Sequence, residues 1–347
     1  MAAISVIIPC YNVASYIDRC LTSITSQTID LSHLEIICID DSSTDNTWSK
    51  LQKWEADYPD NIMIIHCNEN GRQGKARNIG LSYASSDWIA FIDSDDWVEP
   101  DYFEKMYTAA LGTTADMITC GHVRDFSTTL TCRHNTDYDY SKDTVFGKFI
   151  TLDTEEKKKL YIRMMSSDLT AWGKLVKRNL LLENEIFFPE GLAYEDNYWG
   201  TLLHFYVTQI YEIDLPIYHY FVNENSTILS MNADYHEDFL TVQLLKWNAF
   251  LERGFLKDYY EEICFDFLHA CYLDFFKIIC LRYDPPSFSR FLLLKEVILT
   301  HIPDYSKNKY FEQGFTEFQH MLIDLLRLPV NKEQFLKITE YVKLHGI

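Results

Sequence analysis

The first 120 residues alternate between short apolar runs and segments whose apolar side chains recur with helical spacing. The apolar runs, each of strand length, are residues 4–8, 34–39, 62–65, 88–92 and 117–120. A buried parallel strand has this continuous apolar character, and consecutive parallel strands are joined by crossovers that are usually helices. The alternation therefore predicts an α/β fold with a mostly parallel sheet flanked by helices. Pro9 is expected to end the first strand.

The pattern changes after about residue 235, where only helical spacing remains. A last strand-like run at 209–213 precedes the change, and Leu240, Leu244 and Trp247 then recur on one face of an expected helix. We therefore predict two domains, an α/β domain over residues 1–234 and an all-helical domain over residues 235–347.

Charge and cysteine usage exclude several classes of protein. Lys and Arg number 31 against 51 Asp and Glu, a formal net charge of −20. A nucleic-acid-binding protein needs a basic surface to neutralise phosphates, so that class is excluded. The nine cysteines form no CxxC pair and no secretory signal precedes the first apolar run, which indicates reduced thiols and a cytoplasmic location. Residues 263–281 are the most apolar stretch, but they include Asp266, Asp274 and Lys277, which argues against a bilayer span.

Carboxylates stand where two of the expected strands end. Asp40 and Asp41 follow the second apolar run, and Asp93, Ser94 and Asp95 follow the fourth. The carboxyl ends of parallel strands open onto the ligand crevice of an α/β sheet, where a buried carboxylate needs a cation or a donor. Asp93 and Asp95 can converge on one hard cation such as Mg²⁺ or Mn²⁺. A D-x-D pair is common by chance, and its place after a strand makes it a metal-site hypothesis.

Three further side chains carry open alternatives. Tyr11, just beyond the first strand, could stack on a base or be a partly buried packing tyrosine. Arg77 could face a diphosphate or lie on a solvated helix surface. Asp196 could act as a general base, since apolar Tyr194 and charged Glu195 would raise its pKa, or it could cap the helix that follows.

Taken in order, these segments resemble the inverting glycosyltransferases of the GT-A class known as family 2. The resemblance is carried by 6–12 (VIIPCYN), 39–45 (IDDSSTD), 74–80 (GKARNIG), 91–96 (FIDSDD), 171–175 (AWGKL) and 191–196 (GLAYED). It covers about residues 3–230 and implies a Rossmann-like, GT-A type catalytic domain. The helical tail carries no recognised motif.

The resemblance implies a binding site for a nucleotide sugar. Pro9 and Tyr11 would border the nucleobase, and Asp41 would bond the uracil ring of a UDP-sugar. Beside these matched positions, Arg77 is a candidate for the diphosphate and Trp172 for the sugar face.

The resemblance also implies a metal and a base. Asp93, with Ser94 beside it, would lie near the ribose and the metal, and Asp95 would bind Mn²⁺ or Mg²⁺ directly. His219 resembles a later histidine that touches metal or diphosphate in some members. Asp196 would be the catalytic base.

The implied reaction is a metal-dependent single displacement with inversion. A hexose or N-acetylhexosamine would pass from an NDP-sugar, with UDP favoured, to a hydroxyl of a glycan or lipid-linked glycan, in surface polysaccharide synthesis. Paired carboxylates also suit a glycoside hydrolase, which the strand-end metal motif disfavours. The non-enzyme alternative is a nucleotide-sugar-binding or scaffolding protein of a glycan assembly complex.

The helical tail is open to three hypotheses. It could contact the acceptor, form a homodimer with a second copy, or touch a membrane peripherally at the inner face of the cell membrane. The acidic total disfavours anionic lipid, so membrane contact would be limited to the periphery.

Overall fold

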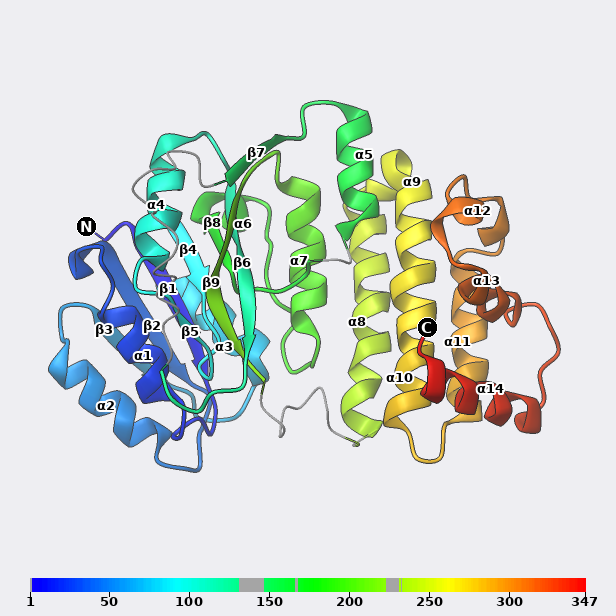
Figure 1. Cartoon of the computed structure of the whole chain (residues 1–347), viewed down its shortest axis with the longest axis horizontal. Coiled ribbons are helices and arrows are strands. Elements are labelled where there is room, and N and C mark those ends of the chain that lie inside the picture. Colours follow the sequence, from blue (N-terminus) through cyan, green and yellow to red (C-terminus); the bar gives the residue numbers. More distant parts are fainter. Residues whose placement is uncertain (1, 131–146, 166–167, 223–230, 232) are drawn as a thin grey trace. The chain divides into compact units, whose positions relative to one another are not determined.

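The computed structural model describes residues 2–130, 147–165, 168–222, 231 and 233–347 (Figure 1). The chain divides into two compact units. The first combines residues 1–153 with 170–223, and the second combines residues 154–169 with 224–347. The division drawn from the sequence placed residues 154–169 in the first domain, whereas here they group with the C-terminal helices, and it drew the later boundary at 234 rather than at 223.

The first unit is built on a nine-stranded sheet whose first half is parallel. Its strands β1 to β4 lie in the order β3-β2-β1-β4, and every ladder between them is parallel. These strands are β1 (Ile4–Cys10), β2 (Leu34–Asp40), β3 (Ile62–His66) and β4 (Trp88–Phe91). The helices between them are α1 (Ile17–Thr25), α2 (Thr47–Asp57) and α3 (Arg72–Tyr83). The alternation predicted from the apolar runs is confirmed.

The second half of the sheet is mixed. Beyond β4 the order is β8-β6-β9-β5, and β7 pairs with β9. The ladder between β6 and β9 is parallel, whereas β8, β5 and β7 are added in antiparallel fashion. The strands are β5 (Trp97–Val98), β6 (Met117–Asp125), β7 (Gly147–Thr151), β8 (Lys174–Lys177) and β9 (Gln209–Phe221), and the helices are α4 (Tyr102–Gly112), α6 (Arg178–Glu183) and α7 (Glu195–Tyr206).

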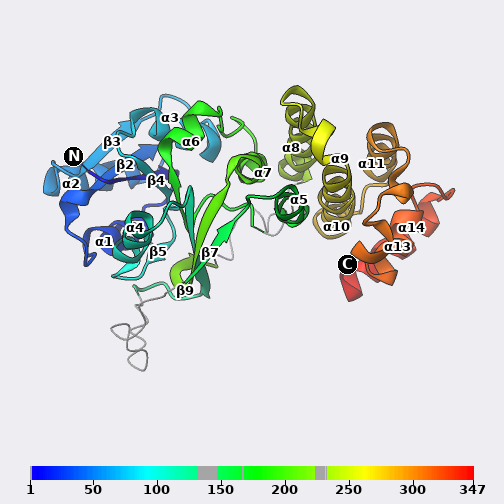
Figure 2. The same ribbon diagram turned by 90° about the horizontal axis from the view of Figure 1, so that it is seen from above.

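Helices cover both faces of the sheet. Seen from above, α3 and α6 lie on one face while α1 and α4 lie on the other (Figure 2). Helix α3 approaches β1 and β2 closely at Gly80, where a Cβ atom would stand only 2.4 Å from Ile7 Cγ2 and 2.8 Å from Ile39 Cδ1. A larger residue at position 80 would push α3 away from the sheet, and with it the side chains that α3 carries to the strand ends.

Pro9 does not end β1, which continues to Cys10. Proline lacks the N–H that a central strand normally needs. It is tolerated because the ladder to β4 covers only Ile4 to Ile7, so β4 does not reach the position of Pro9. The side chain of Pro9 is buried.

The second unit is helical. Its helices are α5 (Glu155–Arg163), α8 (Ala233–Glu252), α9 (Phe255–Asp266), α10 (Phe275–Arg282), α11 (Phe288–His301), α12 (Phe311–Gly314), α13 (Glu317–Asp324) and α14 (Lys332–His345). Helix α5 packs against α9, and the Arg163 guanidinium lies 4.9 Å from the centroid of the Tyr310 ring, which explains why this segment joins the unit. No described helix is both long and apolar enough to cross a membrane.

A buried polar cluster lies inside this unit, beside the π-helical segment Phe267–Asp274 that joins α9 to α10. Lys246 and Asp266 are 1% and 2% exposed, with 3.3 Å between Nζ and Oδ2. Gln243, one turn earlier on α8, is fully buried, and neither atom of its amide has a hydrogen-bond partner in the described part of the chain. Burying an ion pair costs desolvation that its attraction repays only with good geometry.

Replacing the whole ion pair should therefore cost little. Lys246→Met with Asp266→Leu is expected to leave the free energy of unfolding of this unit unchanged or raise it by about 1–4 kcal/mol. Lys246→Met alone strands a buried carboxylate and should lower it by about 3–5 kcal/mol. Guanidinium chloride unfolding measures both, with Lys257→Met on the exposed side of α9 as control. Equal losses in the single and double variants would contradict this account.

Candidate active site

The ends of β1, β2 and β4 form one edge of the sheet, where the predicted site residues collect. Cys10 stands opposite Asp40 in the register of β1 and β2. The Asp41 N–H donates to the Cys10 carbonyl at 2.8 Å, and the Ile92 N–H donates to the Ile7 carbonyl at 3.1 Å. The loops that begin at Asp41 and Asp93 therefore leave the sheet at the same edge, as the sequence predicted.

Asp41 lies beside this edge, and one of its two carboxylate oxygens accepts a hydrogen bond. Its Oδ1 accepts the Gly71 N–H at 2.9 Å, whereas Oδ2 is buried and has no hydrogen-bond partner among the described residues. Burial raises the pKa of Asp41, against the backbone N–H groups of Gly71 and Arg72. Tyr11 is 47% exposed, so about half of its surface is open to solvent at this edge. Of the two residues expected to border a base, only Tyr11 is exposed here.

The D-x-D loop carries three carboxylates, those of Asp93, Asp95 and Asp96, and their surroundings differ. Asp96 is buried and satisfied, since Oδ2 accepts the Tyr218 hydroxyl and Oδ1 accepts the Phe221 N–H, both at 2.7 Å. Asp93 and Asp95 are half-buried, and Ser94 between them is buried. Burial and the charge of Asp93 raise the pKa of Asp95 to about 6. A bound cation would relieve this repulsion.

Arg77 joins the two acidic motifs of the site. It is 3% exposed, which excludes the solvated helix surface considered from the sequence. Its Nη2 donates to Asp93 Oδ1 at 2.7 Å, and its Nη1 donates to Glu195 Oε1 at 2.5 Å. Against the cost of burial, these two carboxylates raise the pKa of Arg77. One guanidinium thus binds two carboxylates, at positions 93 and 195, which lie 102 positions apart in the chain.

Glu195 and Asp196 occupy the first turn of α7. The N-cap is Tyr194, in the left-handed conformation with φ 61°, and no side chain caps the helix. Asp196 is half-buried and bonds the Asn197 side chain at 3.0 Å, so it is not the N-cap. Burial raises the pKa of Glu195 to about 7 against the effect of Arg77, and burial likewise raises the pKa of Asp196. The single positive charge of Arg77 does not neutralise the negative charges of all the carboxylates around it.

The approach of α7 to α3 depends on two residues that the sequence did not single out. Asn78 Nδ2 donates to the Phe188 carbonyl at 2.9 Å, and Asn78 Oδ1 accepts the Phe188 N–H at 2.9 Å. At Gly74 a Cβ atom would stand 2.4 Å from the Pro189 carbonyl oxygen. These contacts hold the loop before Glu195 against the helix that carries Arg77. Their only sequence signal is membership of the 74–80 motif.

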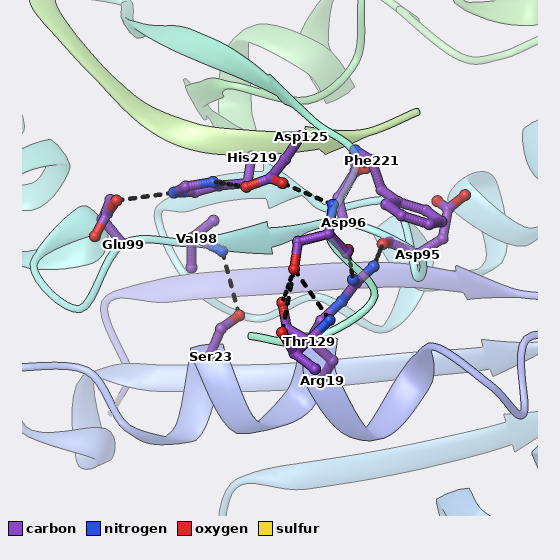
Figure 3. Close-up of polar contacts among 11 residues, drawn as sticks. Arg19, Ser23, Asp95, Asp96, Val98, Glu99, Asp125, Thr129, His219 and Phe221 are labelled. Carbon is purple, nitrogen blue, oxygen red and sulfur yellow. Dashed lines mark hydrogen bonds and ion pairs between the residues drawn. The ribbon is translucent and has the colours of Figure 1, made fainter. Parts of the chain in front are cut away.

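His219 lies in β9 with both ring nitrogens engaged (Figure 3). Nε2 is 2.8 Å from Glu99 Oε1, Nδ1 is 3.2 Å from Asp125 Oδ2, and the ring stacks on Trp97. The side chain is fully buried. This arrangement gives no support to the metal or diphosphate role suggested for His219, and the histidine instead ties three strands together.

Arg19 was not predicted and it anchors the D-x-D loop from α1 (Figure 3). Its Nη2 donates to the Asp95 carbonyl at 2.5 Å and its Nη1 donates to the Ser127 carbonyl at 2.7 Å. The guanidinium lies 3.9 Å from the centroid of the Trp97 ring. A lone arginine in a helical pattern gives no sequence signal for such a contact, because its partners are backbone carbonyls far along the chain.

The donor set fits a hard divalent cation in part. No group of three or more His, Cys, Asp or Glu side chains in the described ranges could hold a metal by itself. Asp93 and Asp95 offer two carboxylates at the strand edge, and Mg²⁺ or Mn²⁺ commonly takes one or two carboxylates and completes its shell with phosphate oxygens and water. The residues therefore fit a cation that binds together with a phosphorylated ligand.

Comparison with known proteins identifies the family. The family model described as Glycosyl transferase family 2 matches residues 5–181. The chain belongs to that family and is a glycosyltransferase, which confirms the resemblance noted in the sequence.

Relatives extend the likeness beyond the matched segment. The chain is 29% identical over 275 residues to the putative glycosyltransferase EpsH of Bacillus subtilis (strain 168), covering 77% of this chain and 75% of EpsH. It is 23% identical over 273 residues to the poly(ribitol-phosphate) beta-N-acetylglucosaminyltransferase TarS of Staphylococcus aureus (strain MW2), covering 78% of this chain and 44% of TarS. The crystal structure of S. aureus TarS 1–349 in complex with UDP-GlcNAc superposes with a TM-score of 0.55 at 19% identity, covering 91% and 93% of the two chains. This last likeness shows a shared GT-A-like fold.

The excess of carboxylates predicts an unusual pH dependence in the absence of metal. The pKa of Glu195 rises from 4.5 to about 7 on folding and that of Asp95 rises from 3.8 to about 6. The folded protein therefore keeps protons that the unfolded chain releases, and this contribution to stability is lost as pH rises through about 4.5 to 7. Glu195→Gln should remove its share of the slope, up to about 1.4 kcal/mol per pH unit.

Denaturant unfolding in chelator at several pH values measures this slope. Glu183→Gln, an exposed glutamate on α6, serves as the matched control and should keep the slope of the unmodified protein. A slope in Glu195→Gln equal to that of the unmodified protein would show that Glu195 carries no such proton.

Proposed function

We propose that this glycosyltransferase moves a hexose or N-acetylhexosamine from a UDP-sugar to a hydroxyl of a glycan or lipid-linked glycan, with inversion. The observation that carries the proposal is the Arg77 bridge. It joins Asp93 of the D-x-D loop to Glu195, the neighbour of Asp196, within one strand edge. This contact supports a single site in which donor binding and proton removal lie close together.

The nucleotide is proposed to be UDP. Asp41 offers a buried carboxylate oxygen for which the described residues supply no partner, and leaving such a group unsatisfied is costly. The imide N–H of uracil supplies the missing donor, and the exposed ring of Tyr11 lies next to β1 for stacking on the base. The UDP-GlcNAc bound to TarS makes UDP the first nucleotide to test. Pro9, buried in β1, would support this corner from beneath.

A divalent metal would be held by Asp95 and Asp93. When bound, Mn²⁺ or Mg²⁺ supplies positive charge against the diphosphate leaving group. The chain's own residues set the position of these carboxylates: Arg77 orients Asp93, and Arg19 fixes the backbone of Asp95. Ser94 is buried between them, where its backbone can shape the turn around the ribose.

Asp196 is proposed as the general base. Its raised pKa suits proton removal from an acceptor hydroxyl near neutral pH. Glu195 is occupied with Arg77, which leaves Asp196 as the acid of this pair that does not pair with the guanidinium in the described contacts. One base and no protein nucleophile imply a single displacement, so an α-linked donor gives a β-linked product. The beta linkage in the name of TarS supports this outcome.

The cellular role is proposed to be surface polysaccharide synthesis on the cytoplasmic side. A lipid-linked acceptor would be reached at the inner face of the membrane. The names of the relatives support polymer glycosylation. Peripheral membrane contact, acceptor contact and homodimer formation remain three hypotheses for the helical unit.

Removing either proposed key carboxylate should stop transfer without unfolding the protein. Asp196→Asn keeps the size of the side chain and should lower kcat by about 10²–10⁴-fold while UDP still binds, because only proton removal is lost. Asp95→Ala should weaken binding of UDP together with Mn²⁺ and abolish transfer. Radiolabelled sugar transfer and circular dichroism are measured together.

Asp60→Asn, an exposed aspartate beyond α2, is the control and should transfer normally. Full transfer by Asp196→Asn would exclude the proposed base. If either variant failed to fold, we would conclude that the carboxylate it replaces has a structural role.

Metal affinity should depend on the protonation of Asp95. Its pKa of about 6 means that protons compete with the cation below that pH. We expect Mn²⁺ affinity in the presence of UDP to fall by up to about tenfold per pH unit below about 6 and to level off above it. Electron paramagnetic resonance of free Mn²⁺ measures this, and a pH-independent affinity between 5 and about 8 would contradict it.

A further inference from the structure

An aromatic and basic strip runs along β6 and β9 beside the D-x-D loop. In the parallel ladder, His122 stands opposite Tyr218 and Arg124 stands opposite Tyr220. Alternate residues of a strand project to the same face, so the four side chains share one face of the sheet. The Trp172 ring lies parallel to Tyr218 and Tyr220, with centroids 4.7 and 5.5 Å away.

The strip borders the proposed metal edge directly. The Tyr218 hydroxyl donates to Asp96 Oδ2 at 2.7 Å and lies 3.3 Å from the Asp93 N–H. Burial raises the pKa of Tyr220, as do the charges of Asp96, Asp93 and Asp95, while Arg124 acts in the opposite direction. Tyr220 is thus within electrostatic reach of both the acidic loop and Arg124.

The outer part of the strip is open to solvent. His122 and Arg124 are exposed, and Trp172 and Tyr220 are half-buried. His122 meets the Trp172 ring edge-on, with centroids 5.0 Å apart. The described residues give the Arg124 guanidinium no hydrogen bond or ion pair, although the chain as a whole carries a net charge of −20. Within the described part of the chain, an exposed arginine thus has no carboxylate partner in an acidic protein.

From this arrangement we propose that the strip is the acceptor subsite and that the acceptor carries an oxyanion, either a phosphate or a carboxylate. The rims of Trp172 and Tyr220 pack against the carbon face of a sugar or polyol, and Arg124 binds the oxyanion with help from His122. The planar guanidinium matches both oxyanions through paired hydrogen bonds. This inference rests on the proposed function and adds the chemical class of its acceptor.

The neighbouring carboxylates give the strip a condition for binding. Asp93 and Asp95 would repel an anion while they are uncompensated, and a divalent cation at that edge reverses the local sign. The acceptor anion therefore binds after the metal and the nucleotide. A neutral acceptor would gain nothing from Arg124.

The test measures acceptor binding in saturating UDP and Mn²⁺, which fill the diphosphate position so that a phosphate probe cannot enter it. Saturation-transfer NMR compares ribitol 5-phosphate with ribitol, and glucuronate with glucose. At least one charged probe should bind about tenfold more tightly than its neutral match. Whichever charged probe does so identifies the oxyanion.

Arg124→Gln should remove that preference without changing UDP binding. Lys148→Gln, which deletes an exposed cation on β7 beside Glu212, is the matched control and should keep the preference. The inference is overturned if neither charged probe is preferred, or if Arg124→Gln and Lys148→Gln behave alike. Absence of UDP binding would sink the proposed function, and this inference with it, whereas normal UDP binding without anion preference would sink the inference alone.

Discussion

One buried guanidinium organises the site. Arg77 reaches Asp93 at the end of β4 and Glu195 at the start of α7, and it is almost fully buried between them. Buried carboxylates without a cation are expensive, so this contact permits two acidic motifs to converge on one edge. The convergence leaves more negative than positive charge, which is why burial and like charge raise the pKa of Asp95 and Glu195.

The scaffold around this cluster is rigid where the chemistry requires fixed geometry. Both carboxylate oxygens of Asp96 accept hydrogen bonds from β9, at Tyr218 and Phe221, which holds the D-x-D loop against that strand. Arg19 holds the same loop to α1. Asn78 and Gly74 hold the loop before α7 against α3. These contacts fix the D-x-D loop and the loop before α7, as a preorganised electrostatic site needs.

Sequence reasoning located the first four strands because each is a short, largely apolar run. Strands β1, β2 and β4 are almost wholly buried, whereas β3 at the edge of the sheet is partly exposed. The same reasoning did not locate β5 and β8, which have two and four residues and join the sheet in antiparallel pairs. Segments that short carry no period, and distant partners decide their pairing. Asp41, Asp93 and Asp95 were singled out because they follow strands. The contacts of His219 in β9 depend instead on Asp125 in β6 and on Glu99, which follows β5.

The amino-acid sequence by itself determined the α/β class, the edge at which the acidic residues meet, and the family, since all three follow from local runs and their order. Only the tertiary structure decided the partners: Arg77 between two motifs, Arg19 on backbone carbonyls, a buried histidine between carboxylates, and residues 154–169 with the C-terminal helices. The physical reason is that burial of a strand or helix gives neighbouring residues a recognisable apolar pattern. The partner of a buried charge lies on a distant segment of the chain, and no local pattern indicates which segment that is.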